Sequence, residues 1–301
     1  MPNVPLTRLT SLSSFRRIAA VAWPEPRDPH MYGSMEIRVE ALEAWIAAER
    51  ARSGERITVT HAVTRALAMV IANHRDVNGV VRFGSIYLRR DVDIFVQVAV
   101  EAEGGKAATA DLSGVKIARA ETLDVVGIAR TLRERAAKIR ARQDEDFERT
   151  KGLLDRVPGF LLGPLLGLFD WMSWTLNISP RLLGSPPDPF GSAMVTNVGV
   201  FGLTKAWAPF FPLARCSMIV TLGAIEVRPC VEGDRIVPGR VLHVNGTFDH
   251  RLVDGLHAGL VAKELRQLLE EPARMAMGAT QTSANKIHAA VDPAAARSTG
   301  E

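Results

Sequence analysis

The stretch from Arg235 to Pro272 constrains the fold most, because two different periodicities meet within it. Residues 235–246 alternate branched apolar with polar side chains, which is typical of a half-buried strand. Apolar side chains then recur at helical spacing until Pro272 ends the pattern (Leu256, Leu260, Val261, Leu265, Leu268 and Leu269). The sequence therefore predicts a strand followed by a helix, with an ionisable cluster at residues 249–254 between them.

His250 and Asp254 are the candidate reactive side chains of this junction. An imidazole titrates near neutrality and accepts a proton from a thiol or a hydroxyl, so His250 has the chemistry of a general base. Asp254 can fix the turn, accept hydrogen bonds from backbone amides at the helix start, or pair with an arginine. A single histidine in such a place is more often structural, and the spacing H-x-x-x-D-G is what favours a site.

The composition is that of an ordinary globular protein. Of its 301 residues, 47% are apolar and 23% are charged, which is enough for a full core. The net charge is +4 and both signs are interleaved along the helices, so we expect no nucleic-acid partner. Cys216 and Cys230 lack a C-x-x-C spacing, and the N-terminus lacks the apolar core of a signal peptide. These features predict a reducing cytoplasm.

Periodicity predicts the remaining elements in outline. The predicted strands are 35–39, 92–101, 220–226 and a hairpin of 80–83 with 86–88, joined at Gly84-Ser85. The predicted helices are 39–52, which ends at Gly54, a helix capped by Thr58 or Thr60 that runs to about Asn73, and 121–151. His61 and His74 are interpreted as residues on a helix surface. Residues 15–23 fit either a strand or a short helix.

Residues 157–169 form an uncharged apolar run that is broken by Pro158 and Pro164. A run of this length is too short to span a bilayer, which needs about 20 residues. We expect a loop and helix that pack on the domain or between subunits. Contact with a membrane interface is the alternative, and we do not expect it.

The junction resembles the signature D-H-R-x-x-D-G of the 2-oxo acid dehydrogenase acyltransferases, the E2 catalytic domains, which share their fold with chloramphenicol acetyltransferase. The residues that match are Asp249, His250, Arg251, Asp254 and Gly255. Related acetyltransferases carry a second histidine where Asp249 stands, so the resemblance favours the E2 branch. Residues 192–202 resemble the E2 strand and turn T-I-S-N-L-G-x-x-G, with Thr196 in place of the serine. The two motifs follow each other in the family's order.

The resemblance implies an α/β fold, a two-layer sandwich with a mixed β-sheet of the chloramphenicol-acetyltransferase type, that forms a homotrimer. Each active site would lie at a subunit interface, with His250 from one subunit and Thr196 from the next. His250 would deprotonate the attacking thiol, Thr196 would stabilise the oxyanion, and Asp254 would hold the turn. Asn197 and Gly199 would contribute to coenzyme A binding, and no metal is expected.

Three departures from the family pattern accompany this resemblance. Residues 104–109 (GGKAAT) replace the family's strand near the coenzyme A channel. Residues 16–19 (RRIA) match its opening helix imperfectly, which makes Arg16 or Arg17 a candidate partner of Asp254. The sequence has no Asp-Lys pair of the kind that surrounds a lipoyl lysine. We therefore expect a standalone catalytic domain that meets a lipoyl-bearing protein in trans.

The predicted organisation is a catalytic domain over residues 1–275, with an apolar insert at 152–190, and a disordered tail over 276–301 that begins soon after Pro272. The predicted function is an acyltransferase that moves an acyl group between coenzyme A and a dihydrolipoyl thiol. Alternatives are an O- or N-acetyltransferase for a small molecule and a non-catalytic trimeric scaffold. Trimers of this family join into larger cages, and we expect any such cage here to depend on the insert more than on the tail.

Overall fold

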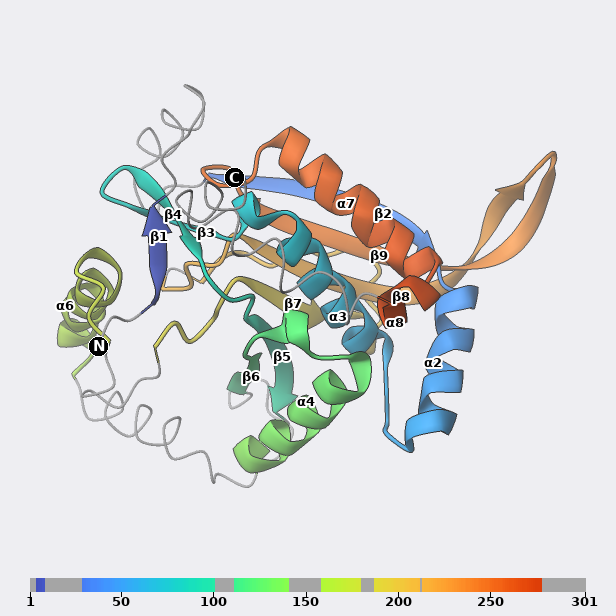
Figure 1. Cartoon of the computed structure of the whole chain (residues 1–301), viewed down its shortest axis with the longest axis horizontal. Helices are drawn as coiled ribbons and strands as arrows, with labels where there is room; N and C mark the ends of the chain where they lie inside the picture. The colour runs from blue at the N-terminus through green and yellow to red at the C-terminus, as the bar shows by residue number, and fades with distance from the viewer. Residues whose placement is uncertain are drawn as a thin grey trace, which may run out of the picture.

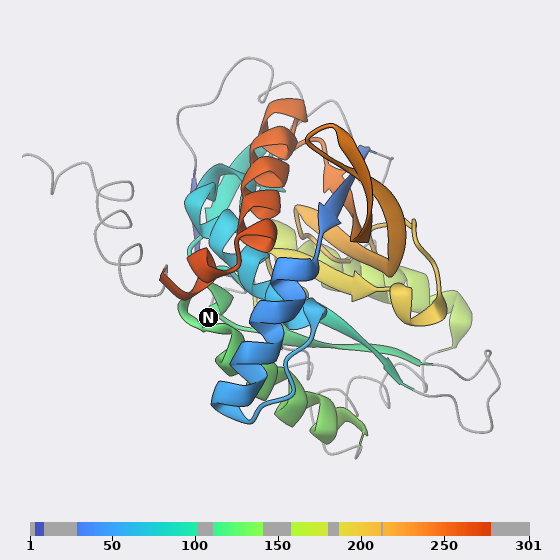
Figure 2. The same ribbon diagram turned by 90° about the vertical axis from the view of Figure 1, so that its right-hand side faces the viewer.

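The computed structural model describes residues 4–8, 29–100, 111–140, 158–179, 187–211 and 213–277. A six-stranded mixed sheet has the order β2-β9-β8-β7-β5-β6, and the helices α2, α3, α4 and α7 form a layer on one of its faces (Figures 1 and 2). The predicted two-layer α/β sandwich is therefore confirmed. The strands are β2 (His30–Arg38), β5 (Ile94–Val100), β6 (Asp111–Ile117), β7 (Ala193–Asn197), β8 (Met218–Glu232) and β9 (Arg235–Asp249). The helices are α2 (Glu40–Ser53), α3 (Val59–Asn73), α4 (Val125–Arg140) and α7 (Gly255–Glu270).

The central strand β7 runs parallel to both β5 and β8, whereas the other neighbours in the sheet are antiparallel. The strands β8 and β9 form a long hairpin whose far half projects beyond the sheet as an arm (Figure 1). A second, three-stranded sheet has the order β1-β4-β3, with β1 (Leu6–Arg8), β3 (Gly79–Arg82) and β4 (Ser85–Arg89).

The core lies between the large sheet and the helix layer, and α3 is its centre. The apolar face that the sequence predicts for this helix is fully buried (Val63, Ala66, Leu67, Val70 and Ile71). The strand and helix predicted around His250 are also confirmed, because β9 passes into α7 through residues 250–254. The reactive turn is thus anchored on both sides by elements whose apolar faces pack into one core.

Turn chemistry decides several element boundaries. Gly54 ends α2 in the left-handed conformation with φ 70°, and Thr58 caps α3, both as predicted. The β3–β4 hairpin is confirmed, but its central residues are Phe83 and Gly84 instead of Gly84-Ser85. Both have positive φ, 48° and 67°, which is what a tight two-residue hairpin turn requires.

The described chain continues past Pro272 and extends two residues into the predicted tail, which begins at residue 276. A short helix α8 (Ala273–Met277) follows, and Met275 is buried against the core. The burial of the apolar Met275 side chain stabilises this segment. Several predicted segments lie outside the described residues: 9–28, 104–109, 141–151 and 278–301.

The apolar run forms a helix, α6 (Gly159–Asp170), which continues as a π-helical turn over Trp171–Thr175. Trp174 is buried with Val4 and Val80, so the prediction that this segment packs on the domain is confirmed. An ion pair between Asp170 and Arg215 also holds it. The outer side chains remain exposed (Leu161, Leu165, Leu168 and Trp171). Among the helices that the structure describes, none is long and apolar enough to cross a membrane.

His61 lies inside the protein, and its interpretation as a surface residue is wrong. Its ring turns back over the start of α3, where Nδ1 accepts a hydrogen bond from the Thr58 backbone N–H at 2.9 Å. Only 9% of the residue is exposed. Burial is the main reason that the pKa of His61 falls to about 4, and the charges of Arg50 and Arg56 lower it further.

His61 should make the protein sensitive to acid. Its pKa is about 6.5 in an unfolded chain, so between about pH 6.5 and pH 4 the unfolded state binds a proton that the folded state does not. The free energy of unfolding should therefore fall as the pH drops through this window. The variant His61→Gln keeps an acceptor for the Thr58 N–H but cannot titrate. Between about pH 7 and pH 4.5 the free energy of unfolding of the variant, measured in urea, should fall by about 2 kcal/mol less than that of the parent. Equal losses in the two proteins would contradict this role.

Candidate active site

The turn between β9 and α7 is fixed by its backbone and by a buried ion pair. Arg251 donates from Nη2 to Asp249 Oδ2 at 2.6 Å and from Nε to Asp249 Oδ1 at 2.9 Å. The backbone N–H of His250 donates to Pro29 O at 2.8 Å. Leu252 and Val253 are buried in the core. His250 is half-buried and belongs to a turn that is held on both sides.

Asp254 is the N-cap of α7, as one of its predicted roles requires. Its Oδ1 accepts from the His257 backbone N–H at 3.0 Å and lies 2.5 Å from His257 Nδ1. Partial burial works to raise the pKa of this carboxyl, but the hydrogen bonds from His257 outweigh it and lower the pKa. The proposed partners Arg16 and Arg17 lie outside the described residues. His257 was not predicted as part of the site. Its position offers a signal, because the third residue after a helix N-cap can contact the cap with its side chain.

A second group of predicted residues lies at the end of β7, where Thr196 and Asn197 are the last two residues of the strand. Asn197 Oδ1 accepts from the Gly199 N–H at 2.9 Å, and Asn197 Nδ2 donates to Thr60 Oγ1 at 3.1 Å. A Cβ on Gly199 would lie 2.4 Å from the carbonyl oxygen of Gly223, so only glycine fits there. The sequence predicts Thr60 only as a possible helix cap, and its contact with Asn197 was not predicted.

A pocket of about 550 Å³ opens beside this turn. The residues that line it include Thr58, Thr60, Asn197 and Gly199. The hydroxyls and the amide give the pocket several hydrogen-bonding groups, and its volume suits a small organic ligand. The arrangement therefore offers a binding site at the end of β7.

The register of the sheet keeps the two groups apart within one chain. Thr196 pairs with Thr221, and Thr221 pairs with Asn245 on β9. His250 follows Asn245 by five residues, so the two side chains are about 13 Å or more apart along the strands and about 10 Å across them. That separation exceeds the reach of a threonine and a histidine. Within one chain the candidate residues therefore form two separate groups, which we call candidate half-sites: His250 with Asp254, and Thr196 with Asn197 and Gly199.

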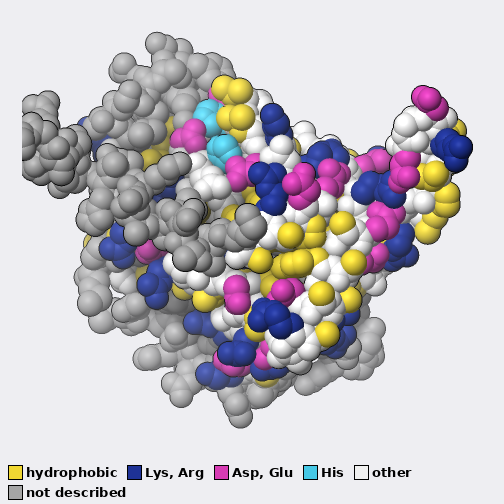
Figure 3. Space-filling model, turned by 45° about the vertical axis from the view of Figure 1, so that its right-hand side comes forward, with side chains coloured by type: hydrophobic (Ala, Val, Ile, Leu, Met, Phe, Trp, Pro, Cys, Tyr) yellow, Lys and Arg dark blue, Asp and Glu magenta, His cyan; other side chains and the backbone are white. Residues whose placement is uncertain are grey.

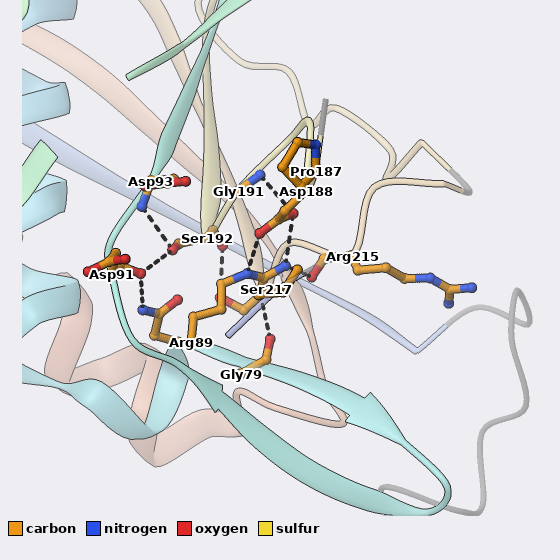
Figure 4. A network of polar contacts seen from close by, with 12 residues as sticks. Gly79, Arg89, Asp91, Asp93, Pro187, Asp188, Gly191, Ser192, Arg215 and Ser217 are labelled. Atoms are coloured by element: carbon orange, nitrogen blue, oxygen red, sulfur yellow. Dashed lines mark hydrogen bonds and ion pairs between the residues drawn. The ribbon is translucent and has the colours of Figure 1, made fainter. Parts of the chain in front are cut away.

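A buried network around Arg89 holds the segments that lead into these half-sites (Figure 4). Arg89 is 2% exposed and donates from Nε to Asp188 Oδ2, from Nη1 to Gly79 O and from Nη2 to Arg215 O, each at 2.9 Å. Asp188 Oδ1 also accepts from the Gly191 N–H at 3.2 Å. One guanidinium thus joins β3 to the loops that precede β7 and β8.

Replacing Arg89 with methionine should destabilise the protein strongly. The variant Arg89→Met leaves the Asp188 carboxylate buried without the guanidinium, which should cost about 3–5 kcal/mol of unfolding free energy. Its neighbour Arg90 pairs with Asp91 at the surface and is 69% exposed. The matched variant Arg90→Met should therefore change stability by no more than about 0.5 kcal/mol. Urea unfolding of both variants checks this, and equal midpoints would contradict it.

The comparisons with known proteins identify the family of this chain. Residues 10–152 and 190–277 match the family described as 2-oxoacid dehydrogenases acyltransferase (catalytic domain). This match covers well over half of the chain, and the chain belongs to that family. The resemblance found in the two motifs is therefore confirmed.

One curated relative is the dihydrolipoyllysine-residue acetyltransferase component of the acetoin cleaving system of Bacillus subtilis (strain 168). It is 26% identical over 226 residues, which are 74% of this chain and 44% of the relative. The chain spans about half the length of the curated relatives it matches.

Two solved structures show the same fold. The cubic core of the pyruvate dehydrogenase multienzyme complex superposes with a TM-score of 0.59 at 18% identity, over 91% of this chain and 93% of that chain. The dihydrolipoamide acetyltransferase of Azotobacter vinelandii, in whose catalytic mechanism a serine, a histidine and an asparagine were investigated, gives the same TM-score, identity and coverage.

Proposed function

We propose that this chain is an acyltransferase that moves an acyl group between coenzyme A and a dihydrolipoyl-type thiol. The observation that carries the proposal is the turn with His250 and Asp254, which has the family's signature and lies within the family match. His250 would remove the proton from the attacking thiol, a contribution of about 10²- to 10⁴-fold in rate. Asp254 would keep the turn in place.

Thr196 is proposed to donate a hydrogen bond to the oxyanion that forms during transfer. Losing one such donor costs on the order of 3 kcal/mol of transition-state stabilisation. In the Azotobacter vinelandii protein the investigated histidine and asparagine are 4 positions apart, as His250 and Asp254 are here. The investigated serine precedes that histidine by 52 residues, and Thr196 precedes His250 by 54. The similar spacing supports assigning the serine's role to Thr196.

Coenzyme A is proposed to bind beside Asn197 and Gly199, in the pocket at the end of β7. The hydroxyls of Thr58 and Thr60 and the Asn197 amide suit the amide-rich arm of this substrate. The dihydrolipoyl thiol would come from a lipoyl-bearing partner. Transfer would then consist of deprotonation of one thiol by His250, attack on the thioester carbonyl, and return of the proton to the departing thiolate.

A homotrimer is proposed because it would bring Thr196 of one copy to His250 of the next. Exposed apolar side chains support contact with another copy, since a soluble protein must cover such surfaces. They follow the Thr196 turn (Val200, Phe201 and Leu203, 51–71% exposed) and line the projecting arm (Val227, Val231 and Ile236, 66–76% exposed). Figure 3 shows hydrophobic side chains on this arm. The likeness to a cubic core supports a larger cage of trimers.

The domain organisation and the compartment are also proposals. The family match leaves out residues 153–189, which supports the proposal that an apolar insert occupies 152–190 of a catalytic domain spanning 1–275. Both cysteines are free thiols, which supports a reducing cytoplasm. Basic and acidic side chains are interspersed over the face drawn in Figure 3, which supports a function without nucleic acid.

The general-base role predicts the behaviour of His250→Ala. Transfer from acyl-coenzyme A to dihydrolipoamide should fall by about 10²- to 10⁴-fold, because the substitution removes the imidazole proposed to take the thiol proton. Assays of the parent protein with acetyl, succinyl and branched acyl donors identify the acyl group that it transfers. The oligomer mass should not change, because the half-buried ring acts on protons more than on packing. A variant that retains activity within tenfold of the parent would exclude this role.

Two substitutions of Thr196 test the oxyanion role, because one keeps the hydroxyl and the other removes it. Thr196→Ser keeps the donor and should retain kcat within about tenfold, whereas Thr196→Val removes it at nearly constant shape and should lower kcat by about 10²- to 10³-fold. KM should change little in either variant. Steady-state kinetics measures both values. Equal kcat for the two variants would show that the hydroxyl takes no part.

A further inference from the structure

We infer that His257 is a positioning residue of the transfer site: its imidazole holds the Asp254 carboxylate and so fixes the turn that carries His250, while its contact with Asp76 keeps the imidazole in place. This inference rests on the proposed acyl transfer. His257 lies outside the signature D-H-R-x-x-D-G, which ends at Gly255.

The geometry of His257 is that of a bridge between two carboxylates. Its Nδ1 lies 2.5 Å from Asp254 Oδ1, and its Nε2 lies 2.8 Å from Asp76 Oδ2. Its side chain is 13% exposed, whereas those of Asp254 and Asp76 are 26% and 44% exposed. Both ring nitrogens lie within hydrogen-bonding distance of a carboxylate oxygen. The imidazole thus lies between two acidic side chains.

The bridge connects segments that already pack against the reactive turn. Asp76 belongs to a short 3₁₀ turn (Arg75–Val77), which leads through Asn78 into β3. A Cβ on Gly79, the first residue of β3, would lie 3.1 Å from Leu252 Cδ2, so β3 touches the turn between β9 and α7. Removing the imidazole would leave two carboxylates facing the space it filled, and their repulsion would push the two segments apart.

The chain contains a matched link that does not touch Asp254. His74 Nε2 lies 2.7 Å from Glu264 Oε2, which joins α7 to the residue just before the same 3₁₀ turn. Both side chains are about one quarter exposed, so this contact is also an imidazole–carboxylate pair at the edge of the core. His74→Ala therefore tests the loss of a similar link between the same elements, without a change at Asp254.

Two substitutions separate the halves of the bridge. In His257→Asn the amide nitrogen stands near the place of Nδ1 and keeps a donor toward Asp254. In His257→Gln the amide nitrogen stands near the place of Nε2 and keeps a donor toward Asp76. If His257 acts through Asp254, the asparagine variant should recover activity and the glutamine variant should not.

The kinetic test compares these variants with the parent in the dihydrolipoamide assay. His257→Ala and His257→Gln should lower kcat by about tenfold or more, because a small misplacement of a catalytic group is costly, while both KM values stay within about twofold. His257→Asn should return kcat to within about threefold of the parent, and His74→Ala should leave kcat unchanged. If His257→Ala does not fold, the asparagine and glutamine variants decide the question.

A second readout does not depend on turnover. Diethyl pyrocarbonate modifies unprotonated imidazole, and mass spectrometry of peptides measures its rate at His250. That rate should change by about threefold or more in His257→Ala and His257→Gln, but not in His257→Asn or His74→Ala. Unchanged kcat and unchanged His250 reactivity in His257→Ala would overturn the inference. Absent transfer by the parent would instead contradict the proposed function, and the reactivity of His250 alone would then decide the role of His257.

Discussion

The order and register of the large sheet are the constraint on which the rest of this structure depends. Because β7 runs parallel to β8 and β9 runs antiparallel to it, the carboxyl ends of β7 and β9 face opposite ways. Thr196 therefore lies at one end of the sheet and the turn with His250 at the other. A single chain therefore presents two separate candidate half-sites, and exposed apolar side chains lie beside Thr196 and on the arm.

Backbone contacts and paired charges hold the turn that carries His250 and the loops that lead into β7 and β8. Asp249 and Arg251 close the turn before His250, and His257 holds the carboxylate of Asp254 after it. Arg89 joins the loops that lead into β7 and β8. Such buried pairs add little net stability, but they allow only one arrangement of the segments they join, and this rigidity is what a site of defined geometry needs.

The sequence predicts the local parts of this architecture and misses those that depend on contacts distant in the chain. The strand and helix around His250, the stop at Gly54 and the cap at Thr58 follow from periodicity and from turn chemistry. The burial of His61 and the contact of Thr60 with Asn197 do not, because both depend on how α3 packs against the rest of the fold. The bridge from His257 to Asp76 joins residues 181 positions apart, which spacing alone cannot reveal.

Mixing two inactive variants tests most directly whether the site is shared between copies. His250→Ala and Thr196→Val proteins would be refolded together and assayed for transfer to dihydrolipoamide. If each site takes His250 from one copy and Thr196 from the next, random assortment of equal amounts restores about a quarter of the sites and about a quarter of the parental activity. A mixture that is no more active than the sum of the two separate variants would contradict a shared site.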